Sequence, residues 1–319
     1  MKGSPISVYC ASVRGQSHIK SGKPCQDRCC YEVFECGNAN AAVIAVADGL
    51  GSASHSDIGA DIAVHAAVAE IKRYLTTDFE DGLTLAEITP DETVLTDAIS
   101  AAADAIEKYA EDAANGVRKK DLACTLALLY YFKGKTAAAQ VGDGAIVGCF
   151  SDGRTGVVVK PVDSEYINEV TPITAPDWRS RMNVAAGITA PEGLVSAAVF
   201  TDGCIGAVTV KKDGDIEAFE GFFAPLFRYF ESYAGAEAGK GVDVESGVGV
   251  EVGDGVVGGN GVGVGVAENA DIAQLLSSEK MCSVSDDDKT LAVICFGDDA
   301  RRYLRINYDA SDAKPDNSE

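Results

Sequence analysis

The stretch Ala41-Ala-Val-Ile-Ala-Val-Ala-Asp48-Gly49 consists of seven apolar residues that run directly into an acid and a glycine. A short apolar run bounded by a turn signal predicts a buried β-strand. Two further apolar segments end in the same way, at Asp143-Gly144 and at Asp202-Gly203. A fourth acid, Asp288, lies just before the apolar run 290–296. Buried strands are therefore expected to carry four carboxylates toward one edge of the core.

An Asp-Gly pair by itself is only a turn signal. The pairs at 81–82, 152–153 and 213–214 lie in polar surroundings, and for them a turn alone is predicted. The other three pairs and Asp288 indicate a shared site, because clustered carboxylates cannot all stay ionised without cations. Oxygen ligands, in a chain with only 3 histidines, favour Mg²⁺ or Mn²⁺ over zinc. Such ions suit attack of water on phosphorus.

Short apolar runs and two longer periodic segments predict an α+β fold. Helices are expected at 58–75 and at about 95–114, where apolar residues recur at a spacing of three to four. Strands are expected at 41–47, 122–132, 136–141, 145–150, 196–200 and 290–296. Strands and helices do not alternate regularly, which favours α+β over a parallel α/β fold.

Composition and charge exclude several classes of protein. The 319 residues allow one large or two small domains, and 46% hydrophobic residues allow a sizeable core. The formal charge of -22 repels phosphate backbones and anionic lipid, so neither nucleic acid nor a membrane is an expected partner. No apolar run reaches about 18 residues and the N-terminus does not resemble a signal peptide. The 10 cysteines contain no C-x-x-C pair, which favours reduced thiols and a cytoplasmic location.

One segment differs from the rest in composition. Between 241 and 266, 10 residues are Gly and 10 are Val. Glycine at this density raises the cost of ordering the backbone, so a flexible insert at about 237–268 is expected. The alternating valines leave a loose edge hairpin as the alternative. The polar, acidic residues 309–319 are expected to form a disordered tail.

Five blocks of sequence occur in an order typical of one family. They are Ser12-Val-Arg-Gly15 with Cys25-Gln-Asp-Arg28, Val46-Ala-Asp48-Gly49-Leu-Gly51-Ser52, Val141-Gly-Asp143-Gly144, Thr201-Asp202-Gly203, and Asp287-Asp288-Lys289-Thr290. Together they resemble the metal-dependent protein phosphatases of the 2C type. The form Ser17-His18-Ile-Lys20 with Pro24-Cys25-Gln26-Asp27 is similar to a prokaryotic branch of that family.

The resemblance implies a single catalytic domain over 1–308, with a central antiparallel β-sandwich flanked by helix pairs. It also implies two metal ions, Mg²⁺ or Mn²⁺, bridged by a water that attacks phosphoserine or phosphothreonine in line. A phosphoprotein substrate is implied, and a Ser/Thr kinase acting in opposition is a typical partner in such systems. The sequence does not specify the oligomeric state.

Matched residue by residue, the resemblance implies roles for several side chains. Asp48 is implied to bridge both metals, with the Gly49 carbonyl on one of them. Asp202 and Asp288 are implied to complete the ligands of the other metal. Asp143 matches the position that holds an additional metal in many bacterial relatives.

The first block departs from the family pattern. Gln26-Asp27 stands where the family has Glu-Asp. The Gln26 amide offers an oxygen with less charge than a carboxylate. Asp27 is predicted to be a catalytic residue. The family's phosphate-contacting arginine has its nearest match in His18, with Lys20 and Arg14 as rivals. A protonated His18 would bind phosphate and protonate the leaving oxygen. The alternative is a surface histidine before a turn.

Two functional classes compete with an active phosphatase. One is a non-catalytic module that keeps the fold and binds phosphoproteins. The other is a divalent-ion buffer, which is disfavoured because buffers gather their acids in one compact loop. His55 and His65 are predicted to be structural.

Overall fold

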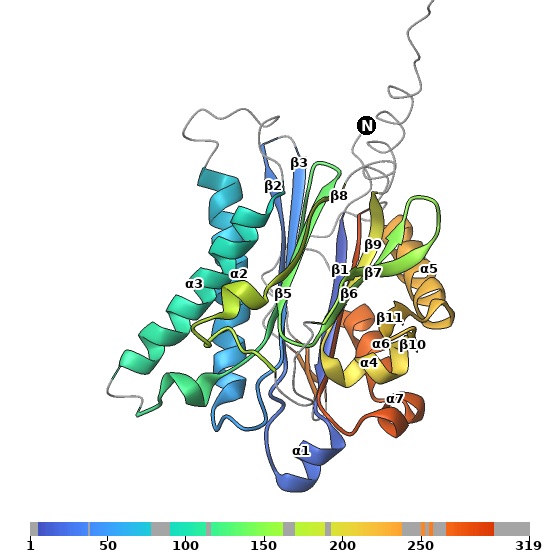
Figure 1. Cartoon of the computed structure of the whole chain (residues 1–319). Helices are drawn as coiled ribbons and strands as arrows, with labels where there is room; N and C mark the ends of the chain where they lie inside the picture. Colours follow the sequence, from blue (N-terminus) through green and yellow to red (C-terminus); the bar gives the residue numbers. More distant parts are fainter. Residues whose placement is uncertain are drawn as a thin grey trace, which may run out of the picture.

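Two antiparallel β-sheets lie face to face in the computed structural model of the chain, with helices on both outer surfaces (Figure 1). The structure describes residues 6–37, 39–77, 90–112, 116–161, 170–188, 193–237, 250–252, 255–257 and 266–296. The predicted tail at 309–319 and the Asp-Gly pair at 81–82 lie outside these residues. The arrangement confirms the predicted α+β sandwich with helices on both sides.

The smaller sheet has five strands in the order β2-β3-β4-β5-β8. The strands are β2 (Arg28–Cys36), β3 (Ala39–Ala47), β4 (Leu126–Phe132), β5 (Lys135–Val141) and β8 (Asn183–Ile188). The larger sheet has seven strands in the order β12-β13-β1-β14-β9-β6-β7. The strands are β1 (Ser7–Val13), β6 (Ala145–Phe150), β7 (Thr155–Val159), β9 (Leu194–Phe200), β12 (Val250–Val252), β13 (Gly255–Val257) and β14 (Lys289–Cys295). A separate hairpin is formed by β10 (Thr209–Lys212) and β11 (Asp215–Ala218).

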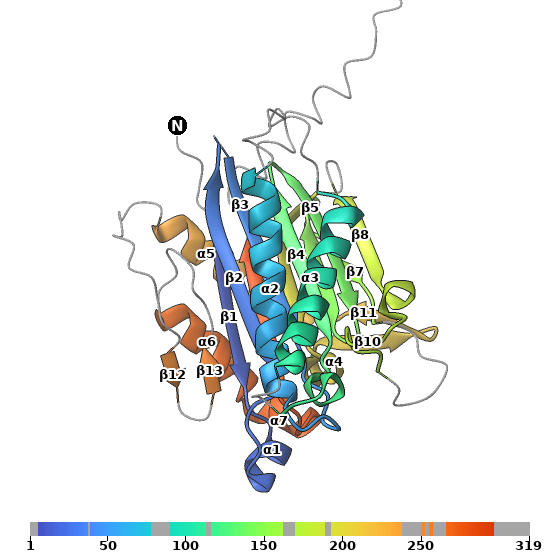
Figure 2. The ribbon, with the colours of Figure 1, turned by 90° about the vertical axis from the view of Figure 1, so that its left-hand side faces the viewer.

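Helices cover the outer face of each sheet. The helices α2 (Ser56–Thr77) and α3 (Glu92–Glu111) lie side by side across the five-stranded sheet (Figure 2). The other sheet carries α4 (Asp202–Val208), α5 (Glu220–Glu237), α6 (Val266–Leu276) and α7 (Glu279–Val284). The short elements α1 (Gln16–Ser21), η1 (Lys119–Leu122) and η2 (Trp178–Arg181) lie in connections. Among the described helices, none is both long enough and apolar enough to span a membrane.

The seven apolar residues before Asp48 form β3, and both of its faces are buried. Val43 and Ala45 pack toward α2 and α3, while Ile44 and Val46 face the seven-stranded sheet. All four side chains are at most 1% exposed. A strand that is covered on both faces needs an unbroken apolar run and not an alternating one. The sequence of this segment therefore predicts its buried position at the centre of the sandwich.

The two kinds of Asp-Gly pair have different structural roles, as predicted. Gly153 and Gly214 have φ of +86° and +91° and lie in the β6–β7 and β10–β11 turns, where a left-handed backbone favours glycine. Gly203 is different, since a Cβ there would lie 1.9 Å from the backbone oxygen of Asp288. Glycine at 203 is therefore required by the close approach of two chain segments, and not by a turn.

The Gly/Val-rich segment contains an edge hairpin, the alternative that the sequence left open. At 250–252 and 255–257, β12 and β13 form an antiparallel hairpin. The flexibility expected over about 237–268 stays a prediction. Strand β13 adds to the edge of β1, with Val256 opposite Ser12. Strand pairing at a sheet edge is made by backbone groups alone, so an alternating Gly/Val sequence is able to form it. Helix α6 then begins at Val266.

Candidate active site

Three of the four predicted carboxylates meet at one end of the sandwich. Asp48 follows β3, Asp143 lies in the turn between β5 and β6, and Asp202 opens α4 directly after β9. Their nearest carboxylate oxygens all lie within 4.8 Å of one another. We refer to Asp48, Asp143 and Asp202 as the acidic cluster.

The acidic cluster is electrostatically unfavourable without a cation. Burial, followed by the charges of Asp27, Asp202 and Asp143, holds the pKa of Asp48 well above its usual range. Burial and the charges of Asp143 and Asp287 raise the pKa of Asp202 to about 7. Burial also raises the pKa of Asp143. Divalent cations would relieve this repulsion, since they favour the ionised carboxylates.

Backbone contacts fix the position of Asp48 and present the neighbouring carbonyl. The Asp48 amide donates to Thr125 Oγ1 at 3.0 Å, and the Thr125 amide donates to the Asp48 carbonyl at 2.8 Å. The Gly49 amide donates to the Gln26 carbonyl at 3.2 Å. Within the described part of the chain, no hydrogen bond is made to the Gly49 carbonyl oxygen. That oxygen is available as a ligand.

Asp27 lies on the buried side of the acidic cluster, in a network of hydroxyl groups. Its side chain is 1% exposed, and its Oδ2 accepts from Thr201 Oγ1 at 2.8 Å and from Thr290 Oγ1 at 2.9 Å. Burial and the charge of Asp288 raise the pKa of Asp27 to about 8. The carboxyl groups of Asp27 and Asp48 also share a hydrogen bond. Asp27 therefore helps to hold the Asp48 carboxyl group in position. No feature of the sequence identified this network.

Two buried oxygen atoms at the site lack hydrogen-bond partners among the described residues. They are Asp143 Oδ1 and Gln26 Oε1. The Gln26 amide nitrogen donates to Ser56 Oγ at 2.6 Å, which turns Oε1 away from Ser56. A buried polar atom without a partner costs about 1–3 kcal/mol. Oxygen atoms held in this way fit a hard divalent cation.

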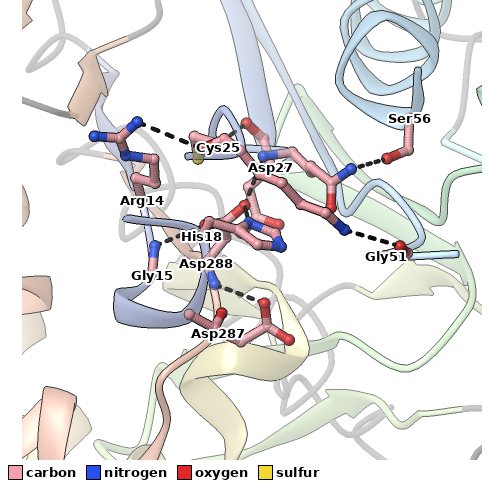
Figure 3. Close-up of polar contacts among 12 residues, drawn as sticks. Arg14, Gly15, His18, Cys25, Asp27, Gly51, Ser56, Asp287 and Asp288 are labelled. Carbon is pink, nitrogen blue, oxygen red and sulfur yellow. Dashed lines mark hydrogen bonds and ion pairs between the residues drawn. The ribbon is translucent and has the colours of Figure 1, made fainter. Parts of the chain in front are cut away.

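The structure does not place Asp288 in the acidic cluster, contrary to the expectation. Its buried carboxylate accepts from the Gly15 amide at 2.6 Å through Oδ1, and from the Gln26 amide at 2.6 Å through Oδ2. Oδ2 also lies 2.8 Å from His18 Nδ1 (Figure 3). The side chain turns inward because it satisfies backbone amides that the close approach of the segments at 15 and 288 removes from water.

Asp287 was not singled out from the sequence. Its side chain is exposed, and its charge contributes to the raised pKa values of Asp202 and Asp143. A ligand atom of Asp287 also lies within 4.8 Å of ligand atoms of His18 and Asp288. Three consecutive acids precede β14, and the sequence offered no means of choosing among them. Only the direction of each side chain separates their roles.

The three candidates for phosphate contact differ in environment. The His18 side chain is 12% exposed and is held against Asp288. Lys20 is exposed in the last turn of α1. Arg14 donates through Nη1 to the Lys23 carbonyl at 3.4 Å. The contact with Asp288 bonds His18 to an acid that borders the site.

The structural comparisons agree with this architecture. A structure described as a bacterial serine phosphatase matches 91% of this chain and 98% of its own, with a TM-score of 0.51 and 12% identity. The catalytic domain of the serine/threonine protein phosphatase PstP, in complex with two manganese ions, matches 91% and 98%, with a TM-score of 0.50 and 14% identity. At these identities the likeness shows a common fold.

Sequence comparison defines the family. The model of the protein phosphatase 2C family matches residues 14–239. Serine/threonine-protein phosphatase 3 of Escherichia coli (strain K12) is 32% identical over 200 residues, which cover 61% of this chain and 72% of that protein. The chain belongs to the protein phosphatase 2C family. It is an enzyme of the phosphoprotein phosphatase class.

Proposed function

We propose that the chain hydrolyses phosphoserine and phosphothreonine in phosphoproteins, and that it requires two Mg²⁺ or Mn²⁺ ions. The observation that carries the proposal is the acidic cluster, in which three carboxylates converge from different strand ends with no neutralising side chain among the described residues. Family membership and the name of the Escherichia coli relative support the substrate class. The 10 free cysteines support a reducing, cytoplasmic location.

Several residues of the chain would hold the ions. Asp48 would serve both ions and the Gly49 carbonyl one of them, Asp202 and Asp287 would serve the other, and Asp143 would hold an additional ion. We replace Asp288 by Asp287 in this set because the Asp288 oxygens are already engaged by backbone amides. Gln26 Oε1 would offer a further oxygen ligand, with less charge than a glutamate. Bound divalent ions neutralise these acids and activate the attacking water.

The chain supplies the remaining chemistry through His18. When a serine or threonine leaves, its oxygen requires a proton. His18 lies in the segment that borders the site and has one ring nitrogen, Nε2, without a partner among the described residues. Nε2 would contact the phosphate and donate the proton to the leaving oxygen. Lys20 and Arg14 lie nearby in sequence and would add positive charge.

A phosphatase assay with and without metal tests the proposal. The purified protein should hydrolyse a phosphoserine peptide and p-nitrophenyl phosphate with Mn²⁺ or Mg²⁺, and a chelator should stop both reactions. Full turnover in metal-free buffer contradicts the metal requirement. Binding of the phosphopeptide without hydrolysis, at any metal concentration, would instead support a non-catalytic module.

Substitution of His18 should depend on the leaving group. His18→Gln is expected to lower turnover of the phosphoserine peptide by about 100-fold or more, the range for loss of a general acid. p-Nitrophenyl phosphate should lose less, because its phenolate leaves without a proton. His65→Gln is the control, since His65 is 53% exposed on α2 and bonds to Asp61 of its own helix. Equal losses on both substrates would show that His18 contacts only the phosphate.

A further inference from the structure

The short helix α1 carries His18 but has no hydrophobic anchor. None of its six residues is buried, so packing does not hold it in place. Its contacts with the segment before β14 are polar. The Ser17 amide donates to the Asp286 carbonyl at 2.9 Å, and the Gly15 amide donates to Asp288 Oδ1 at 2.6 Å. The position of His18 therefore depends on residues 286–288.

The Asp288 carboxylate is at the centre of these contacts. It is 3% exposed and accepts from three donors, two backbone amides and the His18 ring. The 2.8 Å contact is made by His18 Nδ1 (Figure 3). An ionised carboxylate can only accept, so Nδ1 must carry the hydrogen in this contact. The partner of one ring nitrogen determines which nitrogen remains for chemistry.

We propose that Asp288 is a positioning residue for His18, and not a metal ligand: it keeps one hydrogen on Nδ1, so that Nε2 is the nitrogen that carries the second proton of the protonated ring, contacts the phosphate and gives this proton to the leaving oxygen. The inference rests on the proposed function, because it assigns Asp288 a role in that reaction. A histidine held by a buried carboxylate loses rotamer freedom before substrate arrives, which reduces the cost of reaching a productive geometry.

The same residues allow one competing interpretation. Ligand atoms of His18, Asp287 and Asp288 lie within 4.8 Å of one another, which is close enough to hold an ion. In that case Nδ1 would bind the metal and would lose its hydrogen. The two interpretations therefore predict opposite states of Nδ1 in the metal-loaded protein.

Nitrogen NMR of the intact protein distinguishes them, and a variant is needed only to assign the signals. The chain has 3 histidines, and His18→Gln identifies the His18 signals. At a pH where the ring is neutral, His18 should carry its hydrogen on Nδ1, both without metal and at saturating Mg²⁺. A hydrogen on Nε2, or loss of the Nδ1 hydrogen when Mg²⁺ is added, would overturn the proposal.

Adjacent acids provide a matched pair of variants. Asp288→Asn should lower turnover of the phosphoserine peptide by about 10- to 100-fold, the usual cost of removing a supporting carboxylate. Its loss on p-nitrophenyl phosphate should be smaller, and its Mn²⁺ affinity, measured by calorimetry, should stay close to that of the wild type. Asp287→Asn should weaken Mn²⁺ binding instead. Weakened Mn²⁺ binding in Asp288→Asn contradicts the proposal.

A double variant separates positioning from a general loss of structure. In the His18→Gln background, Asp288→Asn should cause little further loss of turnover, because the residue that it positions is already gone. Additive losses contradict the inference and indicate a merely structural role. If the wild type hydrolyses neither substrate, the proposed function fails, while the NMR result still decides the contact between Asp288 and His18.

Discussion

Asp48→Asn is expected to lower phosphopeptide turnover at least about 1,000-fold, which corresponds to about 4 kcal/mol of transition-state stabilisation. Asp48 belongs to the acidic cluster with Asp143 and Asp202, and its carboxyl group shares a hydrogen bond with that of Asp27. The amide keeps the shape of the carboxylate but removes the charge that a divalent ion requires. Steady-state kinetics at saturating Mn²⁺ measure the loss.

The same variant should have the opposite effect on the stability of the metal-free protein. Because the charges of Asp27, Asp202 and Asp143 oppose ionisation of Asp48, removing one charge should leave the melting temperature equal or higher. The increase in melting temperature caused by Mn²⁺ should shrink. Asp213→Asn is the matched control, an exposed Asp-Gly pair in the β10–β11 turn. A destabilised Asp48→Asn protein that still hydrolyses phosphopeptide would show that Asp48 only anchors a turn.

The stability of the metal-free protein should fall as the pH rises from about 4 to about 8. Asp202 and Asp27 have folded-state pKa values of about 7 and about 8, against an ordinary value of 3.8. The folded state therefore binds more protons than the unfolded chain throughout this window, and raising the pH favours unfolding. Melting temperatures in chelator at several pH values measure the effect. A rising or flat profile would contradict the assigned electrostatics.

Saturating Mn²⁺ should largely remove that pH dependence. The ion binds ionised carboxylates in the folded site, and at about 100 times its dissociation constant it adds about 2.7 kcal/mol of stability. The metal-induced rise in melting temperature should accordingly be larger at pH 8 than at pH 5, where protons compete for the same oxygens. Equal shifts at both pH values would indicate that the ion binds elsewhere.

The central strands were predictable because both faces of each are buried. The predicted strand at 145–150 coincides with β6, and those at 41–47 and 290–296 differ from β3 and β14 by one or two residues. The predicted strand at 122–132 begins only at Leu126, because Leu122 ends η1 and Cys124 forms only an isolated bridge with Gly49.

Strands with a polar or exposed face were not predicted. β2 mixes charged and apolar residues, β8 is partly exposed, and the β10–β11 hairpin is mostly polar. Their pairing comes from neighbouring strands and from turn geometry, which a single sequence shows weakly.

The candidate site was predictable where one acid ends one strand. Asp48, Asp143 and Asp202 each follow an apolar run. β3 and β5 run in the same direction on either side of β4, so their C-terminal ends lie at the same edge of the sheet. Asp288 lies outside the acidic cluster, because Asp287 and Asp288 are neighbours whose side chains point in different directions. Which of the two carboxylates turns inward depends on the backbone amides that lie nearby, and these amides belong to residues 15 and 26.

The hydroxyl network around Asp27 has a consequence for folding kinetics. Asp27 precedes β2 of one sheet, whereas Thr201 and Thr290 come from segments of the other, 174 and 263 residues away along the chain. Contacts of such separation form late, after long loops have closed. An intermediate in which each sheet has formed without docking on the other would contain most of the secondary structure and none of the site. The rate at which phosphatase activity returns during refolding should therefore report the rate at which the two sheets dock.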